Sequence, residues 1–216
     1  ILEEEPQASE EEPKTSKKTT KRRKIDPSMN DSKAFIESIE REKENIACLL
    51  LEDKRVDPSA NSGFAIQRAS LHGYIKLVTK LLNDERTDPA VNDNYAIRMA
   101  AQRGHCLIVE LLLKDERVDP TAADDYAIRM AAQNGHYKIV ELLLKDGRPD
   151  PASKNNEAIR ESVKNGWTGA TEALLTDNRV DPSANENEAF VFACKKGFDR
   201  IVELLLAAQY DESEGN

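Results

Sequence analysis

Apolar residues recur along this chain in a pattern that repeats every 31 residues. In the copy that spans residues 88–118, Ile97, Ala100 and Ala101 share one face of a helix. A second apolar segment, HCLIVELLLKD, follows directly after Gly104. It places five residues on or beside one side of a helix: Ile108, Leu111, Leu112, Val109 and Leu113. Each copy is therefore predicted to hold two short helices, separated by a glycine that ends the first in the left-handed conformation.

The dipeptide Asp-Pro opens each copy, at residues 26, 57, 88, 119, 150 and 181. Proline lacks a backbone donor and pushes the preceding residue towards extended geometry, so Asp-Pro should lie between helices. Asn92, Asp93 and Asn94 are turn formers, and we expect them to cap the helix that follows. Neither helix can bury its apolar face within one copy, but stacked copies can. The prediction is an all-α solenoid of six stacked helix-turn-helix repeats with short connecting turns: 26–56, 57–87, 88–118, 119–149, 150–180 and 181–211.

The segments AAQRGHCLIVELLL and AAQNGHYKIVELLL resemble the consensus of the ankyrin repeat. The resemblance covers all six copies and is strongest over residues 64–145. The family's usual period is about 33 residues, so the shorter copies here predict a shorter projecting turn. The family's T-P-L-H start is replaced by residues 95–98, Y-A-I-R. The resemblance implies a concave face, formed by the first helices and turn tips, that binds a protein partner.

Both ends of the chain differ from the repeats. Residues 1–24 contain six Glu residues followed by seven basic residues and no aromatic residue, which predicts a disordered acidic-then-basic tail. The ankyrin repeat domain is assigned to residues 25–211. The final segment, AAQYDESEGN, is expected to be unstructured, with an acidic tail at 212–216. Because the chain begins with Ile1, it is interpreted as a fragment or a processed product.

Charge argues against nucleic acid as a ligand of the repeats. Beyond residue 24, the 24 basic and 34 acidic residues give a net charge of −10, which repels phosphate backbones. The basic run just before the first repeat is typical of a nuclear import signal or a nucleic-acid contact. Its residues are Lys17, Lys18, Lys21, Arg22, Arg23 and Lys24. Three cysteines at unrelated repeat positions indicate reduced thiols, and hence an intracellular protein, cytoplasmic or nuclear.

No motif for catalysis, for a phosphate-binding loop or for a metal site is present, so we expect no enzyme activity and no cofactor. His105 and His136 each begin a second helix and are expected to bond neighbouring backbone. No stretch of about 18 apolar residues could span a membrane. We expect a monomer.

The candidate partner-binding residues are positions that change between copies while their neighbours stay constant. Those after the two small residues of the first helix are Leu71, His72, Gln102, Arg103, Gln133, Asn134, Lys164, Asn165, Lys195 and Lys196. Those at the turn tips are Asn92, Asp93 and Asp124. Plain drift on a solvated surface is the alternative explanation.

Two further rows of residues leave alternatives open. Arg98, Arg129 and Arg160 form either a positive row for an acidic partner or bonds to loop carbonyls and nearby Asp residues. The aromatic row either anchors a partner or fills space left by the shortened turn. Its members are Phe64, Tyr95 and Tyr126.

Repeat five departs most from the pattern. Gly169 lies within its second helix, and Ala170, Thr171 and Ala173 replace larger apolar residues. We interpret this repeat as the least stable unit of the stack.

Two functional hypotheses remain. The first is a non-catalytic interaction module that binds a protein on the concave face. The second is a nuclear protein whose basic tail contacts nucleic acid or chromatin, with the repeats as a spacer.

Overall fold

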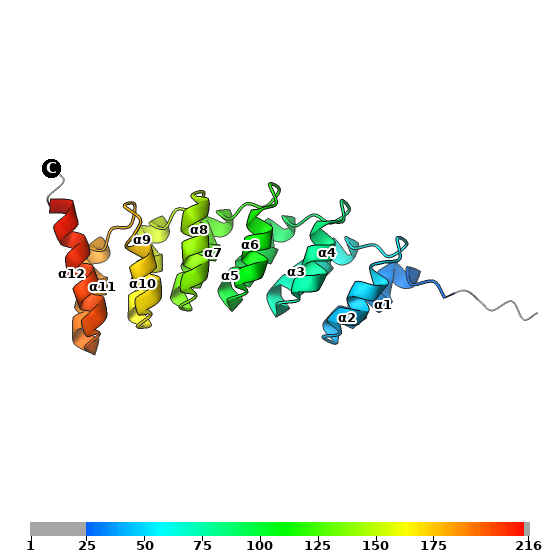
Figure 1. Ribbon diagram of the computed structural model, residues 1–216, viewed down its shortest axis with the longest axis horizontal. Helices are drawn as coiled ribbons and strands as arrows, with labels where there is room; N and C mark the ends of the chain where they lie inside the picture. The colour runs from blue at the N-terminus through cyan, green and yellow to red at the C-terminus, as the bar shows by residue number, and fades with distance from the viewer. Residues whose placement is uncertain (1–24, 214–216) are drawn as a thin grey trace, which may run out of the picture.

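The structure is a computed structural model that describes residues 25–213; residues 1–24 and 214–216, and with them the basic run, lie outside the described part. The described residues form twelve helices and no strand, arranged as helix pairs in a single row (Figure 1). The pairs are α1 (Met29–Glu40) with α2 (Glu44–Leu50), α3 (Ala60–His72) with α4 (Ile75–Leu82), α5 (Val91–Arg103) with α6 (Cys106–Leu113), α7 (Ala122–Gln133) with α8 (Tyr137–Asp146), α9 (Ser153–Lys164) with α10 (Thr168–Leu174), and α11 (Ala184–Lys196) with α12 (Asp199–Ser213).

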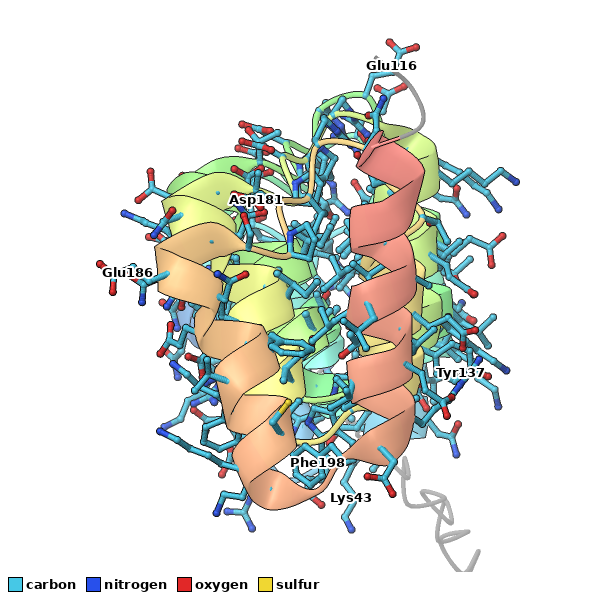
Figure 2. The ribbon with its side chains drawn as sticks, turned by 90° about the vertical axis from the view of Figure 1, so that its left-hand side faces the viewer. Lys43, Glu116, Tyr137, Asp181, Glu186 and Phe198 are labelled. Atoms are coloured by element: carbon cyan, nitrogen blue, oxygen red, sulfur yellow. The ribbon has the colours of Figure 1, made fainter. Side chains whose placement is uncertain are left out.

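The helices form two layers. Each first helix packs on the first helices of neighbouring repeats, as α5 does between α3 and α7, and the second helices form the other layer. Seen along the row, α11 and α12 mark these two layers (Figure 2). The outward side of the first helices is called the first-helix face below. The predicted all-α solenoid is confirmed.

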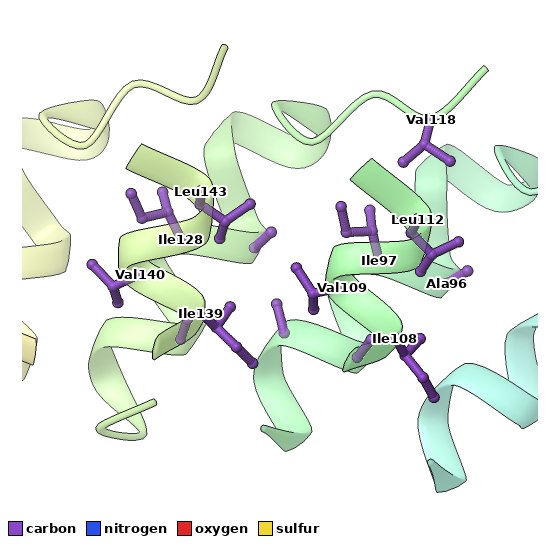
Figure 3. Packing of buried hydrophobic residues seen from close by; sticks show 14 of the residues in the cluster. Ala96, Ile97, Ile108, Val109, Leu112, Val118, Ile128, Ile139, Val140 and Leu143 are labelled. Carbon is purple, nitrogen blue, oxygen red and sulfur yellow. The ribbon is translucent and has the colours of Figure 1, made fainter. Parts of the chain in front are cut away.

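A continuous core lies between the layers (Figure 3). Small residues such as Ala100 and Ala101 are fully buried, which lets neighbouring first helices approach closely. In α6 the buried residues are Ile108, Val109 and Leu112. Leu111, which the sequence placed on the same side, is only half-buried, because the buried stripe runs through Val109 instead.

Three consecutive residues near the start of first helices adopt the left-handed conformation. In repeat three, Asn92, Asp93 and Asn94 have φ between 54° and 56°. A residue with a Cβ atom is destabilised there by roughly 1–2 kcal/mol, and Asn and Asp tolerate it best. The predicted turn is therefore present. The expected capping is wrong, because no side chain caps this helix.

The side chain of Asn94 instead bonds the next repeat. Its Oδ1 accepts a hydrogen bond of 2.8 Å from the backbone N–H of Asp119, in the following Asp-Pro segment. Three other repeats make the same bond at the same spacing: Ser32 Oγ with Asp57, Asp125 Oδ1 with Asp150, and Asn156 Oδ1 with Asp181. The left-handed turn thus presents an acceptor to its neighbour.

Arginines in the return loops provide a second link between repeats. Arg86 Nη2 donates to Asp84 in its own loop at 2.6 Å, and Nη1 donates to the carbonyl of Val56 in the preceding repeat at 2.9 Å. This contact lowers the pKa of Asp84. Three other arginines repeat the carbonyl bond: Arg117 with Thr87, Arg148 with Val118, and Arg179 with Pro149. The carboxylate partner of each arginine thus lies in its own loop, and the acceptor across the repeat boundary is a backbone carbonyl.

A third link starts at the residue after the helix-ending glycine. Gly104 is left-handed with φ 82°, and His105 Nε2 lies 3.1 Å from the carbonyl oxygen of Leu71 in the repeat before. His136 contacts the carbonyl of Gln102 in the same way. In repeat five, Trp167 Nε1 donates to the carbonyl of Gln133 at 2.9 Å, so a different ring keeps the bond.

The C-terminus differs from the sequence expectation. Helix α12 runs to Ser213, through residues that were expected to be unstructured and two residues beyond the assigned domain end at 211. The physical reason is that the Asp-x-Arg return loop that follows the second helix in repeats two to five is replaced by residues 208–210, Ala-Gln-Tyr, while Ala207 and Ala208 favour helix.

Thr87 occupies a buried position where Val56, Val118 and Val180 stand in other repeats. Its hydroxyl has no hydrogen-bond partner among residues 25–213. Replacing Thr87 with Val keeps the shape and removes a buried unpaired group, so the free energy of unfolding should rise by about 1 kcal/mol. Urea unfolding at constant slope measures the change. The reverse variant, Val118→Thr, should lose a similar amount, and a neutral result for both would contradict this account.

Repeat five should open more readily than repeats three and four. Its core replaces large side chains with Ala170 and Ala173, and it contains a buried pair, Ser162 Oγ and Thr171 Oγ1, 2.9 Å apart. Lost apolar volume lowers local stability. Amide hydrogen exchange should show at least about tenfold lower protection in 150–180 than in 88–149. Equal protection would exclude the idea.

Gly169 offers an internal check of that prediction. It is exposed, and an added Cβ would lie 3.5 Å from Tyr137, an ordinary contact. Gly169→Ala should therefore stabilise α10 by about 1 kcal/mol through helix propensity alone and raise its protection.

Candidate binding face

The sequence-predicted site residues lie at two opposite ends of the first helices. One row, from His72 through Arg103 to Lys196, follows the C-terminal ends, and the other, represented by Asn92 and Asp124, lies in the left-handed turns. None of the thirteen residues is buried. Residues 95 and 102 are seven positions apart and therefore about 10 Å apart along the helix axis, so the two rows are not brought together.

A further stripe of residues, which includes the arginine row and the aromatic row, lies between these two rows. It follows positions i, i+3 and i+4 of each first helix, opposite the buried residues. We call it the central stripe: Phe64, Gln67, Arg68, Tyr95, Arg98, Met99, Tyr126, Arg129, Met130, Glu157, Arg160, Glu161, Glu188, Val191 and Phe192. Together with Gln102 and its equivalents it covers the first-helix face. The helical spacing from Tyr95 was the signal that could have revealed it.

Arginines of the central stripe bond the turn before their own helix. Arg98 donates from Nε to the carbonyl of Asp93 at 2.7 Å and from Nη2 to that of Asn92 at 3.0 Å. Arg129 and Arg160 make the equivalent bonds. The interpretation that these arginines bond loop carbonyls is confirmed. Each guanidinium thereby stabilises a strained left-handed turn.

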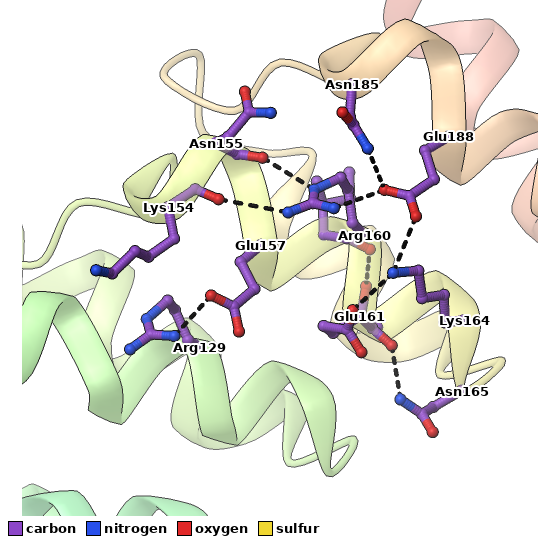
Figure 4. Close-up of polar contacts among 12 residues, drawn as sticks. Arg129, Lys154, Asn155, Glu157, Arg160, Glu161, Lys164, Asn165, Asn185 and Glu188 are labelled. Atoms are coloured by element: carbon purple, nitrogen blue, oxygen red, sulfur yellow. Dashed lines mark hydrogen bonds and ion pairs between the residues drawn. The ribbon is translucent and has the colours of Figure 1, made fainter.

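In the C-terminal half of the stripe, the remaining guanidinium nitrogen meets a carboxylate of the next repeat (Figure 4). Arg129 Nη1 lies 2.7 Å from Glu157, and Arg160 Nη1 lies 2.5 Å from Glu188. Lys164 bonds both Glu161, at 2.8 Å, and Glu188, at 3.0 Å. Lys164, predicted as a partner-binding residue, is therefore part of an internal charge network.

Glu188 is the most perturbed acid of this network. Hydrogen bonds from Arg160, Asn185 and Lys164 stabilise its charged form and lower the pKa of Glu188 to about 2. Its ion pair with Arg160 is about 30% exposed on the Glu side and 16% on the Arg side. Partial shielding of this kind makes the pair stronger than a fully solvated surface pair.

In the N-terminal half, aromatic rings take the place of these carboxylates. The guanidinium of Arg98 lies 5.9 Å from the ring centre of Tyr95 and 5.4 Å from that of Tyr126. The Tyr126 hydroxyl donates to Gln102 at 3.2 Å. Arg68 lies over Phe64 at 5.4 Å. The rings are half-buried, so each keeps part of its surface available while it supports a cation.

The remaining acidic, histidine and cysteine side chains and the surface depressions offer no site for a metal ion or a small ligand within the described residues. Within residues 25–213, no group of three or more His, Cys, Asp or Glu side chains is arranged to hold a metal ion. Depressions between return loops are lined by side chains that already pair, such as Lys80 with Glu52 at 2.9 Å. No helix of the described part is long and apolar enough to cross a membrane.

Stacked helix pairs with backbone-mediated links between successive units define a helical repeat protein. The family model described as ankyrin repeats (3 copies) matches residues 66–155 and 129–215. The chain belongs to the ankyrin repeat family. Ankyrin repeats are in general protein–protein interaction modules.

A solved structure shows the same fold. The crystal structure of EF0377, an ankyrin repeat protein, aligns with a TM-score of 0.64 and 22% sequence identity, over 85% of this chain and 98% of that chain. At this identity the likeness concerns the fold alone. No curated protein sequence matches the chain.

The network around Glu188 predicts a pH-dependent stability. Since its folded pKa lies near 2, below the usual 4.5, its contribution is present above about pH 4.5 and is lost as the pH falls towards 2. Glu188→Gln should lower the free energy of unfolding by about 1 kcal/mol at pH 7, after allowance for solvent screening. The difference from the parent should shrink between pH 5 and pH 3 in urea unfolding. Glu186→Gln, at an exposed site nearby, should change nothing; a Glu188→Gln effect independent of pH would contradict the assignment.

Proposed function

We propose that this protein is a non-catalytic interaction module, a monomer that binds a protein partner on the first-helix face. The observation that carries the proposal is a difference between two kinds of position in the repeat. Core residues and the three inter-repeat links recur in several copies, whereas several positions of the first-helix face differ between copies, although repeats three and four share the same stripe residues. Gln102, for example, corresponds to Leu71 in the repeat before and to Lys164 two repeats later.

Several face residues are not used by the scaffold. The side chains of Arg103 and Lys195 are exposed and make no hydrogen bond or ion pair within residues 25–213, and the exposed ring of His72 only stacks on Tyr74, with ring centres 5.6 Å apart. Drift alone would explain variation, but it gives no reason for Arg, Met and aromatic residues to gather on one face. These types are enriched in protein interfaces.

The proposal is tested by a pull-down from cell extract with the full chain and a face variant, Arg103→Glu with Gln133→Arg and Lys195→Glu. These changes avoid the Lys164 network and should leave the fold intact. A partner held by the parent should be lost by this variant, because two charges of the face are reversed and a new one is introduced. Mass spectrometry identifies the proteins retained, and circular dichroism verifies folding.

A matched control carries three charge changes on the opposite layer: Lys138→Glu, Glu141→Lys and Lys145→Glu on α8. This control should keep the partner. If both variants lose it, or neither does, the first-helix face is not the binding surface.

The alternative rests on the basic run from Lys17 to Lys24, outside the described residues. If that run were the active element, nucleic acid would be retained with a steep salt dependence that disappears when residues 1–24 are deleted. The face variant would then bind nucleic acid as well as the parent does.

A further inference from the structure

Within the central stripe, arginines of two repeats bind a carboxylate of the following repeat in the same geometry. Arg129 and Arg160 are held by the carbonyls of their own turns, which directs Nη1 towards the next repeat. In both cases a carboxylate located 28 residues later accepts from Nη1: Glu157 for Arg129 and Glu188 for Arg160. In two repeats, therefore, a carboxylate is the hydrogen-bond acceptor for Nη1 of the arginine at this position.

At Arg98 the same arrangement is left incomplete. Nε and Nη2 bond the turn as in the other repeats, but the residue 28 positions later is Tyr126, which has no carboxylate. Nη1 of Arg98 has no acceptor among residues 25–213, and the guanidinium lies between the rings of Tyr95 and Tyr126. We call Arg98, with Tyr95, Met99 and Tyr126, the open arginine site. It offers one oriented donor beside aromatic and thioether surface.

The surrounding charge favours an acidic ligand at this end of the face. Arg68 and Arg103 are exposed and form no ion pair within the described residues. The acidic side chains nearby, Asp93 and Asp124, lie in the row of turns, and Asp124 is paired with Lys154 at 2.6 Å. A nucleic-acid backbone would meet those acids and the net negative repeats, whereas a short acidic peptide needs to contact only the central stripe.

The geometry points to an acidic peptide segment of a partner protein as the ligand of the open arginine site. An Asp or Glu of that segment accepts from Arg98 Nη1, as Glu157 does at Arg129, and an adjacent apolar side chain packs on Tyr95, Met99 and Tyr126. The bonds from Nε and Nη2 of Arg98 to its turn orient Nη1, so the charge-assisted bond to the ligand is directional, and the two tyrosine rings supply contact area. The inference rests on the proposed function and specifies its partner.

The test selects peptides from a displayed random library on the immobilised full-length chain. Enriched peptides should share an Asp or Glu beside an apolar residue, and Arg98→Gln should weaken their binding by at least about tenfold. Enrichment of peptides without a carboxylate, no enrichment at all, or equal binding to Arg98→Gln would each overturn the inference.

The most specific control introduces a carboxylate of the chain itself as the acceptor for Arg98. Tyr126→Glu reproduces the pairing that Glu157 and Glu188 already make, so the fold should be kept while the selected peptides lose at least about tenfold in affinity. Tyr126→Phe keeps the ring and should bind within about twofold of the parent, because only the hydroxyl bond to Gln102 is lost. Undiminished peptide binding to Tyr126→Glu would refute the site even if Arg98→Gln had weakened it through misfolding.

Two other occupants are separated by the same assay. If acidic peptides bind only after the six Glu residues of 1–12 are changed to Gln, the chain's own acidic segment is the occupant, and the inference of a separate partner fails. If a single-stranded oligonucleotide binds more tightly than the peptides and needs Arg98, the ligand is a phosphate backbone. If partners are lost by the face variant but not by Arg98→Gln or Tyr126→Glu, the proposed function stands and this inference falls.

Discussion

The stack depends on hydrogen bonds that each repeat cannot make by itself. The left-handed turn of one repeat supplies an acceptor to an N–H that lies 25 residues later, as Asn94 does for Asp119. The return-loop arginine reaches a carbonyl 30 residues earlier, and the ring after the helix-ending glycine reaches one 34 residues earlier. Buried or strained backbone groups are costly when unpaired, so these fixed distances require a constant repeat length. The regular 31-residue period is a consequence of this requirement.

Two substitutions at link positions have different outcomes: one keeps the hydrogen bond and the other loses it. Trp167 replaces histidine and keeps the bond to a neighbouring carbonyl, because an indole N–H can donate from a similar place. Gly63, in contrast, has no side chain to supply the acceptor that Asn94 supplies. An added Cβ at Gly63 would come within 2.7 Å of Val91, so local packing excludes the larger residue. At this position the missing link therefore has a steric reason.

Sequence reasoning recovered the features that are set by local chemistry. The helix pairs follow from apolar spacing, the glycine at Gly104 from its left-handed geometry, and the carbonyl contacts of Arg98 and His105 from their repeat positions. The features that could not be predicted from the sequence depend on contacts between residues of different repeats. Asn94 was expected to cap its own helix, because asparagine beside a helix start often does so. Its Oδ1 instead accepts a hydrogen bond from the backbone N–H of Asp119 in the next repeat. The extension of α12 follows from the loss of the Asp-x-Arg return loop, whose arginine in repeats two to five bonds a carbonyl of the preceding repeat.

The same limit applies to the binding face. The sequence pointed to variable positions at the two ends of the first helices, and the structure shows that Lys164 is occupied internally while the central stripe lies between the two rows. One position per repeat decides the character of that stripe. Where it holds Glu157 or Glu188, the preceding arginine is neutralised within the chain; where it holds Tyr126, the arginine keeps a free donor beside aromatic surface. Because the scaffold around this position is unchanged, a single side chain in each repeat is enough to close a site or to leave it open for a ligand.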